Sequence, residues 1–143
     1  MQCATLLVLM QISLVGAAPQ DAPKYSEAYH ASAESGKPLL ILVGADWCPA
    51  CRTMKGSVLP TVRQRGDLDR VAFARVDTDN ESGLARRLMS GGSIPQLIMY
   101  SKAADGWKRQ QLTGAQSPES VRSFIAQGLP QAKSSIQTTG TRK

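Results

Sequence analysis

The chain has 143 residues, 42% of them hydrophobic, which predicts one globular domain with an apolar core and excludes bulk disorder. The net charge is +6, with 17 Lys and Arg residues. These residues are scattered and form no basic block of five, so a nucleic-acid interface or a membrane-surface patch is not favoured.

The first 17 residues have the pattern of a secretory signal peptide. Residues 4–15 form an uncharged, mostly apolar run that is too short to span a bilayer, and Val15-Gly16-Ala17 supplies small residues at a cleavage site. No Lys or Arg precedes the run, so an uncleaved anchor or a buried apolar arm stays open as an alternative. We expect an exported protein, periplasmic or secreted, with no stable membrane span.

Three further segments are expected after residue 17. Residues 18–23 read as a linker and residues 24–128 as a folded domain. Residues 129–143 read as a disordered tail, because they are rich in Gln, Ser, Thr, Lys and Gly.

The elements of the domain follow from hydrophobic periodicity and from the positions of Pro and Gly. Helices are predicted over residues 25–34, 48–66, 82–89 and 118–128, and strands over residues 39–43, 71–76, 96–100 and 107–113. The second helix is expected to kink near Pro60. The first strand has no polar face, so we expect it to be buried on both sides in the centre of a sheet.

Two cysteines stand three residues apart where the first strand gives way to the second helix, in the sequence Trp47-Cys48-Pro49-Ala50-Cys51. The third, Cys3, lies in the predicted signal peptide. A disulfide between Cys48 and Cys51 would close a very small loop and add little stability. The pair therefore predicts a redox switch better than a structural staple.

The order helix, strand, helix, strand, helix, strand, strand, helix resembles that of the thioredoxin family. The residues that carry the resemblance are Trp47 to Cys51, Val76-Asp77, Ile94-Pro95 and Gly114-Ala115, and it extends over roughly residues 37–128. It implies an α/β fold of the thioredoxin type, with a central mixed four-stranded sheet flanked by helices.

Chemical roles follow from this placement. Cys48 is expected at a helix N-terminus, where unpaired N–H groups and the helix dipole stabilise a thiolate, so it is the predicted nucleophile. Cys51, one turn on and more buried, would resolve the mixed disulfide. The resemblance implies that Pro95 is a cis-proline packed against the pair and that Ile94 offers backbone groups to a bound peptide. Trp47 would shape the partner surface, with core filling as the alternative.

The sequence also departs from the family. Leu42 and Phe73 stand where many thioredoxins have a buried aspartate and a lysine that serve the second cysteine. Proton transfer should therefore differ, and rely on water or on exposed groups such as Asp46.

The sequence lacks the residues that other kinds of catalytic or metal site require. His30 is the single histidine, so Ser/His/Asp catalysis and a four-ligand zinc site are not predicted. Residues 77–81 lack the glycine and the late glutamate of a calcium loop. We expect neither a metal nor a cofactor.

The predicted function is that of a monomeric thiol–disulfide oxidoreductase that acts on protein thiols and disulfides and needs an upstream electron donor or acceptor protein. Ile94 before the proline is typical of reducing thioredoxins, which favours a reductant over an oxidant. The alternatives are a non-enzymatic binding module, a Cu(I) carrier that uses the two thiols, and a domain that serves cytochrome maturation.

Overall fold

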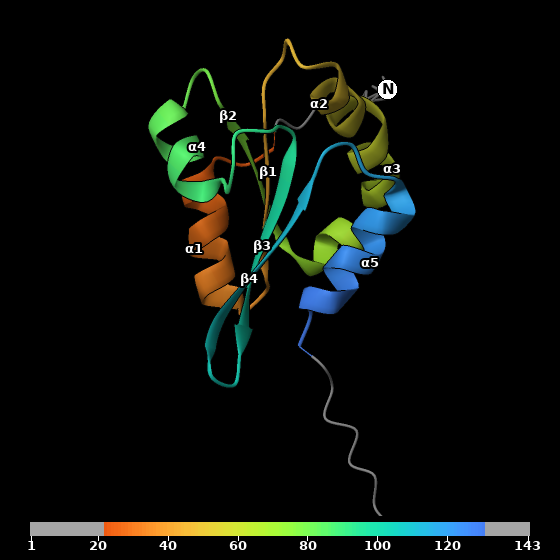
Figure 1. Ribbon diagram of the computed structural model, residues 1–143. Coiled ribbons are helices and arrows are strands. Elements are labelled where there is room, and N and C mark those ends of the chain that lie inside the picture. Colours follow the sequence, from red (N-terminus) through yellow and green to blue (C-terminus); the bar gives the residue numbers. More distant parts are fainter. Residues whose placement is uncertain (1–21, 131–143) are drawn as a thin grey trace, which may run out of the picture.

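The computed structural model describes residues 22–130, drawn in colour in Figure 1. The predicted signal peptide (residues 1–17) lies outside the described residues, as do most of the linker and nearly all of the tail.

A mixed four-stranded sheet forms the centre of the molecule, in the order β2-β1-β3-β4. Its strands are β1 (Leu39–Gly44), β2 (Ala72–Asp77), β3 (Gln96–Ala103) and β4 (Gly106–Thr113). β1 runs parallel to β2 and antiparallel to β3, and β3 and β4 form a hairpin. The expected sheet is thereby confirmed, and β1 is buried at every position.

Strand β3 is three residues longer than predicted. β3 continues past Tyr100 to Ala103, although this extension contains the exposed residues Lys102 and Ala103. It is held by pairing with the start of β4, where Lys102 lies opposite Trp107. Hydrophobic periodicity does not reveal an extension that is stabilised by backbone pairing rather than by burial.

Helices cover both faces of the sheet (Figure 1). α1 (Tyr25–Ser35) and α4 (Ser82–Leu88) lie on one face. α2 (Pro49–Thr53), α3 (Leu59–Gln64) and α5 (Pro118–Gly128) lie on the other. The side chains of β2 alternate as predicted: Phe73 joins the core beneath α3 and α5, and Ala72 and Ala74 join the core on the other face.

The segment predicted as one kinked helix from residue 48 to 66 has three parts. Between α2 and α3 lies η1 (Met54–Val58), a π-helical turn in which the N–H of Leu59 donates to the carbonyl of Met54. The irregularity thus precedes Pro60, because a proline has no N–H and its ring would clash with the carbonyl four residues earlier in a regular helix. A short 3₁₀ turn, η2 (Asp67–Arg70), follows α3 and was not predicted.

Candidate active site

The two cysteines lie at the start of α2, beyond the carboxyl end of β1. Cys48 is the N-cap residue, and its Sγ accepts a hydrogen bond from the backbone N–H of Cys51 at 3.2 Å. Pro49 occupies the first helical position, where its missing N–H leaves no intrahelical bond unmade. Both cysteines are free thiols in this structure. The geometry places Cys48 at the helix N-terminus that the sequence predicted.

Cys51 is the more deeply buried thiol, with none of its surface exposed. It belongs to a small cluster with Ala45 and Cys48, against which Ile94 packs. Burial raises the pKa of the Cys51 thiol to about 11, and the hydrogen bond with Cys48 adds to the increase. The backbone of Ala45 and the charge of Lys55 act in the opposite direction. The Cys51 thiol is therefore protonated at neutral pH.

Gly44, the last residue of β1, makes room for Cys51. A Cβ atom at this position would lie 2.9 Å from Cys51 Sγ and 3.2 Å from Cys51 Cβ. Periodicity and spacing do not predict this role for Gly44. The signal in the sequence that could have indicated it is a glycine at the end of a buried strand, which often marks a close approach of another group.

The peptide bond between Ile94 and Pro95 is cis, as the resemblance implied. The carbonyl of Pro95 accepts a hydrogen bond of 2.8 Å from the N–H of Gly114, in the loop between β4 and α5. Ile94 is half-buried against the cysteine cluster, so the cis-proline loop does face the thiols.

Gln96 holds the loop that precedes the cis-proline, and its role was missed. It is fully buried at the start of β3. Its Nε2 donates to the carbonyls of Ser90 and Ser93 at 3.0 and 2.9 Å, and its Oε1 accepts from the N–H of Ser90 at 3.2 Å. Nothing in its sequence context identifies it, because a glutamine is usually a surface residue.

Trp47 lies on the surface, 65% exposed, so the core-filling alternative is wrong. Its Nε1 donates to the Oδ2 of Asp79 at 2.9 Å. The indole is thus fixed beside Cys48 by the loop that follows β2, and it presents a large apolar surface to solvent next to this thiol.

Three charged or polar contacts surround the motif. Asp46 pairs with Lys55, with 2.7 Å between Oδ1 and Nζ, and this hydrogen bond lowers the pKa of the Asp46 carboxyl. The Nη1 of Arg52 donates to the carbonyls of Asp46 and Trp47, each at 3.1 Å. Asp46 is therefore an ionised partner of Lys55 at neutral pH.

The core positions that depart from the family are apolar in the structure. Leu42 is 1% exposed and Phe73 is 9% exposed, and both belong to the core beneath α3 and α5. Within residues 22–130, no group of three His, Cys, Asp or Glu side chains is placed to hold a metal ion. In the same part of the chain, no helix has the length and apolarity needed to cross a bilayer.

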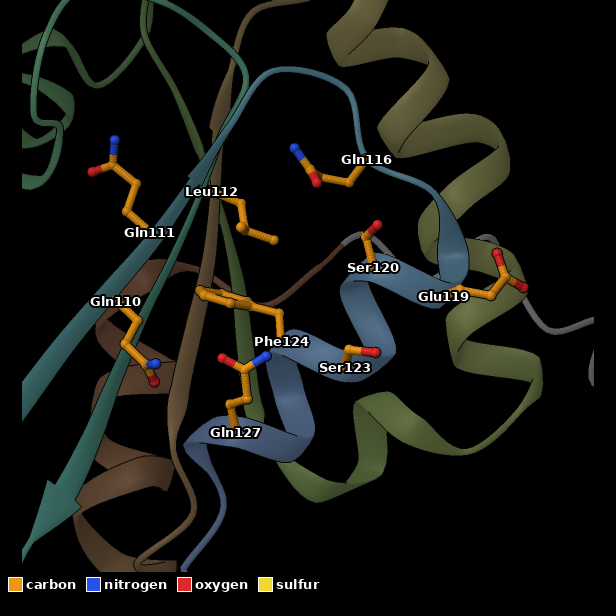
Figure 2. A pocket seen from close by; sticks show the side chains of 9 residues that line it. All are labelled: Gln110, Gln111, Leu112, Gln116, Glu119, Ser120, Ser123, Phe124 and Gln127. Carbon is orange, nitrogen blue, oxygen red and sulfur yellow. The ribbon is translucent and has the colours of Figure 1, made fainter.

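A surface hollow of about 680 Å³ opens between β4 and α5, away from the cysteines (Figure 2). Amides and hydroxyls dominate its lining, with Phe124 between the two elements. Glu119 is its one charged residue, and it forms an ion pair of 3.0 Å with Arg65. No cysteine lines the hollow, so it is separate from the Cys48–Cys51 pair.

Comparisons with known proteins agree with this geometry. A thioredoxin of Coprinus comatus is 26% identical over 95 residues, which are 66% of this chain and 84% of the relative. The solution structure of a Thermus thermophilus thioredoxin is similar with a TM-score of 0.61 and 24% identity, and covers 73% of this chain and 82% of its own. The X-ray structure of Fasciola hepatica thioredoxin has a TM-score of 0.58 and 19% identity, with coverage of 77% and 99%.

These structural likenesses show the thioredoxin fold. The sequence shows the family as well, because a family model described as thioredoxin-like matches residues 19–102, more than half of the chain. Family membership also supports thiol–disulfide oxidoreductase chemistry at the Cys48–Cys51 pair. The chain belongs to the thioredoxin-like family.

Proposed function

We propose that this protein exchanges disulfides with protein substrates through Cys48 and Cys51, and that it acts as a reductant outside the cytoplasm. One observation carries the proposal. The Cys48 thiol lies at a helix N-terminus and accepts a hydrogen bond of 3.2 Å from the backbone N–H of Cys51, whose own thiol is buried. Ile94 of the cis-proline loop packs against the cluster that contains both cysteines. This arrangement separates an attacking sulfur from a resolving sulfur.

The proposed reaction has two displacement steps. The Cys48 thiolate attacks one sulfur of a substrate disulfide, and the other substrate sulfur leaves with the bonding electrons and takes up a proton. Cys51 then loses its proton and attacks the sulfur of Cys48, which releases the second substrate thiol. Two electrons have moved from the protein to the substrate, and an upstream donor protein must reduce the new Cys48–Cys51 disulfide.

The direction and the location rest on the sequence. Ile94 precedes the cis-proline, as in reducing thioredoxins, and residues 1–17 have the pattern of an export signal. An exported reductant requires a dedicated electron donor, because its surroundings are oxidising. Equilibration with glutathione buffers would measure the reduction potential, and a value near about −120 mV, characteristic of a strong oxidant, would overturn the reductant assignment.

The activity itself is tested by reduction of insulin. Wild-type protein should precipitate the insulin chains in the presence of dithiothreitol, and Cys48→Ser should not. Cys51→Ser should accumulate a mixed disulfide through Cys48, visible on a non-reducing gel. Full activity of the Cys48→Ser variant would refute the mechanism.

A further inference from the structure

The buried position of Cys51 creates a difficulty for the second step. A thiolate is the attacking species, yet burial raises the pKa of Cys51 to about 11. The immediate neighbours of Cys51 in the cluster are Ala45, Ala50, Cys48 and Ile94, which supply no positive charge. A cation close to Cys51 would oppose the cost of burial, because an opposite charge favours the ionised form.

Lys55 is placed to be that cation. It lies four residues after Cys51, one turn further along the same helical segment, where side chains at this spacing share a face. Its side chain is only 20% exposed, and Asp46 holds its Nζ at 2.7 Å. Among the described residues, Lys55 is the cation whose charge lowers the pKa of Cys51.

The other charged groups nearby have partners of their own. Lys55 lines a crevice of about 340 Å³ together with Asp46, Arg75, Asp77 and Glu81. The Oδ1 of Asp77 accepts from the N–H groups of the following loop at 2.9 and 3.1 Å. Glu81 accepts from the N–H of Asp77 at 3.4 Å, and the charge of Arg75 acts on Asp46. Arg52 is engaged by backbone carbonyls.

We propose that Lys55, fixed by Asp46, is the positioning residue that stabilises the Cys51 thiolate and so permits resolution of the mixed disulfide. The inference rests on the proposed function. In the step it assists, the S–H bond of Cys51 breaks and its proton passes to solvent. The sulfur lone pair forms the bond to Cys48, and the substrate sulfur leaves with the electron pair. Lys55 stays protonated and is not consumed.

The test separates the two steps with the aromatic disulfide 5,5′-dithiobis(2-nitrobenzoate). Attack by Cys48 on the reagent releases one thionitrobenzoate, and attack by Cys51 on the resulting mixed disulfide releases a second. Stopped-flow absorbance resolves the two phases, and a pH series gives the profile of each. The second phase reports Cys51.

Two substitutions of Lys55 separate the effect of its charge from the effect of its contact with Asp46. Lys55→Gln keeps a polar group beside Asp46 but removes the charge, and should slow the second phase about threefold to tenfold at neutral pH while moving its pH profile upward. Lys55→Arg should restore the wild-type profile. Lys37→Met is the control, because Lys37 is likewise a lysine whose Nζ is held by an acceptor, the backbone carbonyl of Asp69 at 2.8 Å, but it precedes β1 at the end opposite to the cysteines.

The outcomes are distinguishable. A second phase with the wild-type pH profile in Lys55→Gln would overturn the role of Lys55, as would equal slowing in Lys55→Gln and Lys55→Arg. Loss of the first phase in the wild-type protein would instead overturn the proposed function. Thermal unfolding of each variant shows whether the fold is intact.

Discussion

The indole Nε1 of Trp47 and the carboxylate of Asp79 are joined by a hydrogen bond of 2.9 Å. The bond ties the residue before Cys48 to the loop between β2 and α4. A large exposed side chain would otherwise sample several rotamers, so the bond fixes the indole on the surface beside Cys48.

Asp79→Ala should release the indole. We expect the rate of insulin reduction to fall about twofold to tenfold, since one hydrogen bond at an exposed site contributes about 0.5–1.5 kcal/mol. Fluorescence in a Trp107→Phe background reports Trp47 alone, because the chain has two tryptophans, and its emission should change. Asp105→Ala, in the hairpin turn, serves as the control. An unchanged emission in Asp79→Ala would show that the bond does not order the indole.

Gly44→Ala should disturb the Cys51 thiol directly. The new Cβ would lie 2.9 Å from Cys51 Sγ, so strand and helix must move apart. Overpacking of this kind costs about 1–3 kcal/mol, which urea unfolding would measure as a lower free energy of unfolding. Release of the mixed disulfide should slow as well.

Gly83→Ala is the matched control for that experiment. Gly83 lies in α4, where a Cβ would meet nothing within 4 Å. Alanine favours helix over glycine by up to about 1 kcal/mol, so this variant should be as stable as wild type or slightly more stable. Equal stability of the Gly44 and Gly83 variants would contradict the proposed packing constraint.

Gln96→Leu should loosen the cis-proline loop. The substitution removes the hydrogen bonds from Nε2 to the carbonyls of Ser90 and Ser93, at a cost of about 1–3 kcal/mol. Hydrogen exchange of the amides in residues 90–94 should accelerate relative to the rest of the sheet. Gln127→Leu, on α5, should leave that exchange unchanged. If exchange accelerated equally throughout the protein, Gln96 would be a stabilising core residue and not a loop anchor.

The pKa of Cys51 predicts how stability depends on pH. The folded state keeps the thiol protonated up to about pH 11, whereas the unfolded thiol ionises near its ordinary value of 9.0. Ionisation therefore favours the unfolded state as pH rises from 9 to 11. The reduced protein should lose on the order of 1–2 kcal/mol over this interval relative to Cys51→Ala.

Denaturant unfolding at a series of pH values, with the cysteines kept reduced, measures this difference. Below pH 8 the free energies of the two proteins should run parallel. A difference that stays constant from pH 7 to 11 would mean that burial does not perturb the Cys51 thiol.

Much of the fold can be predicted from the sequence, because many of its helices and strands depend on the pattern of neighbouring residues. The apolar run from Leu39 to Val43 predicts a central strand, and the alternation around Phe73 predicts the two faces of β2 correctly. The position of Cys48 at a helix start follows from Pro49 in the same way. Spacing along one chain segment is sufficient for each of these predictions.

The remaining features depend on contacts between distant segments. The bond from Trp47 to Asp79 spans 32 positions. Gly44 matters because of where Cys51 packs, and Gln96 because of where the loop folds back. Even the Asp46–Lys55 pair, nine positions apart, requires the turn into α2 and the π-helical turn after it. Composition and periodicity carry no information on such distances.

The π-helical turn η1 has a consequence for how the reactive end is presented. It accommodates one residue more than a regular helix would, between the segment that bears the cysteines and the segment that anchors in the core. Each residue rotates a helix by about 100°. Loss of a single residue from Met54–Val58 would therefore turn the thiols to a different side while α3 kept its own packing. The length of this turn therefore sets how the segment with the cysteines is rotated relative to α3.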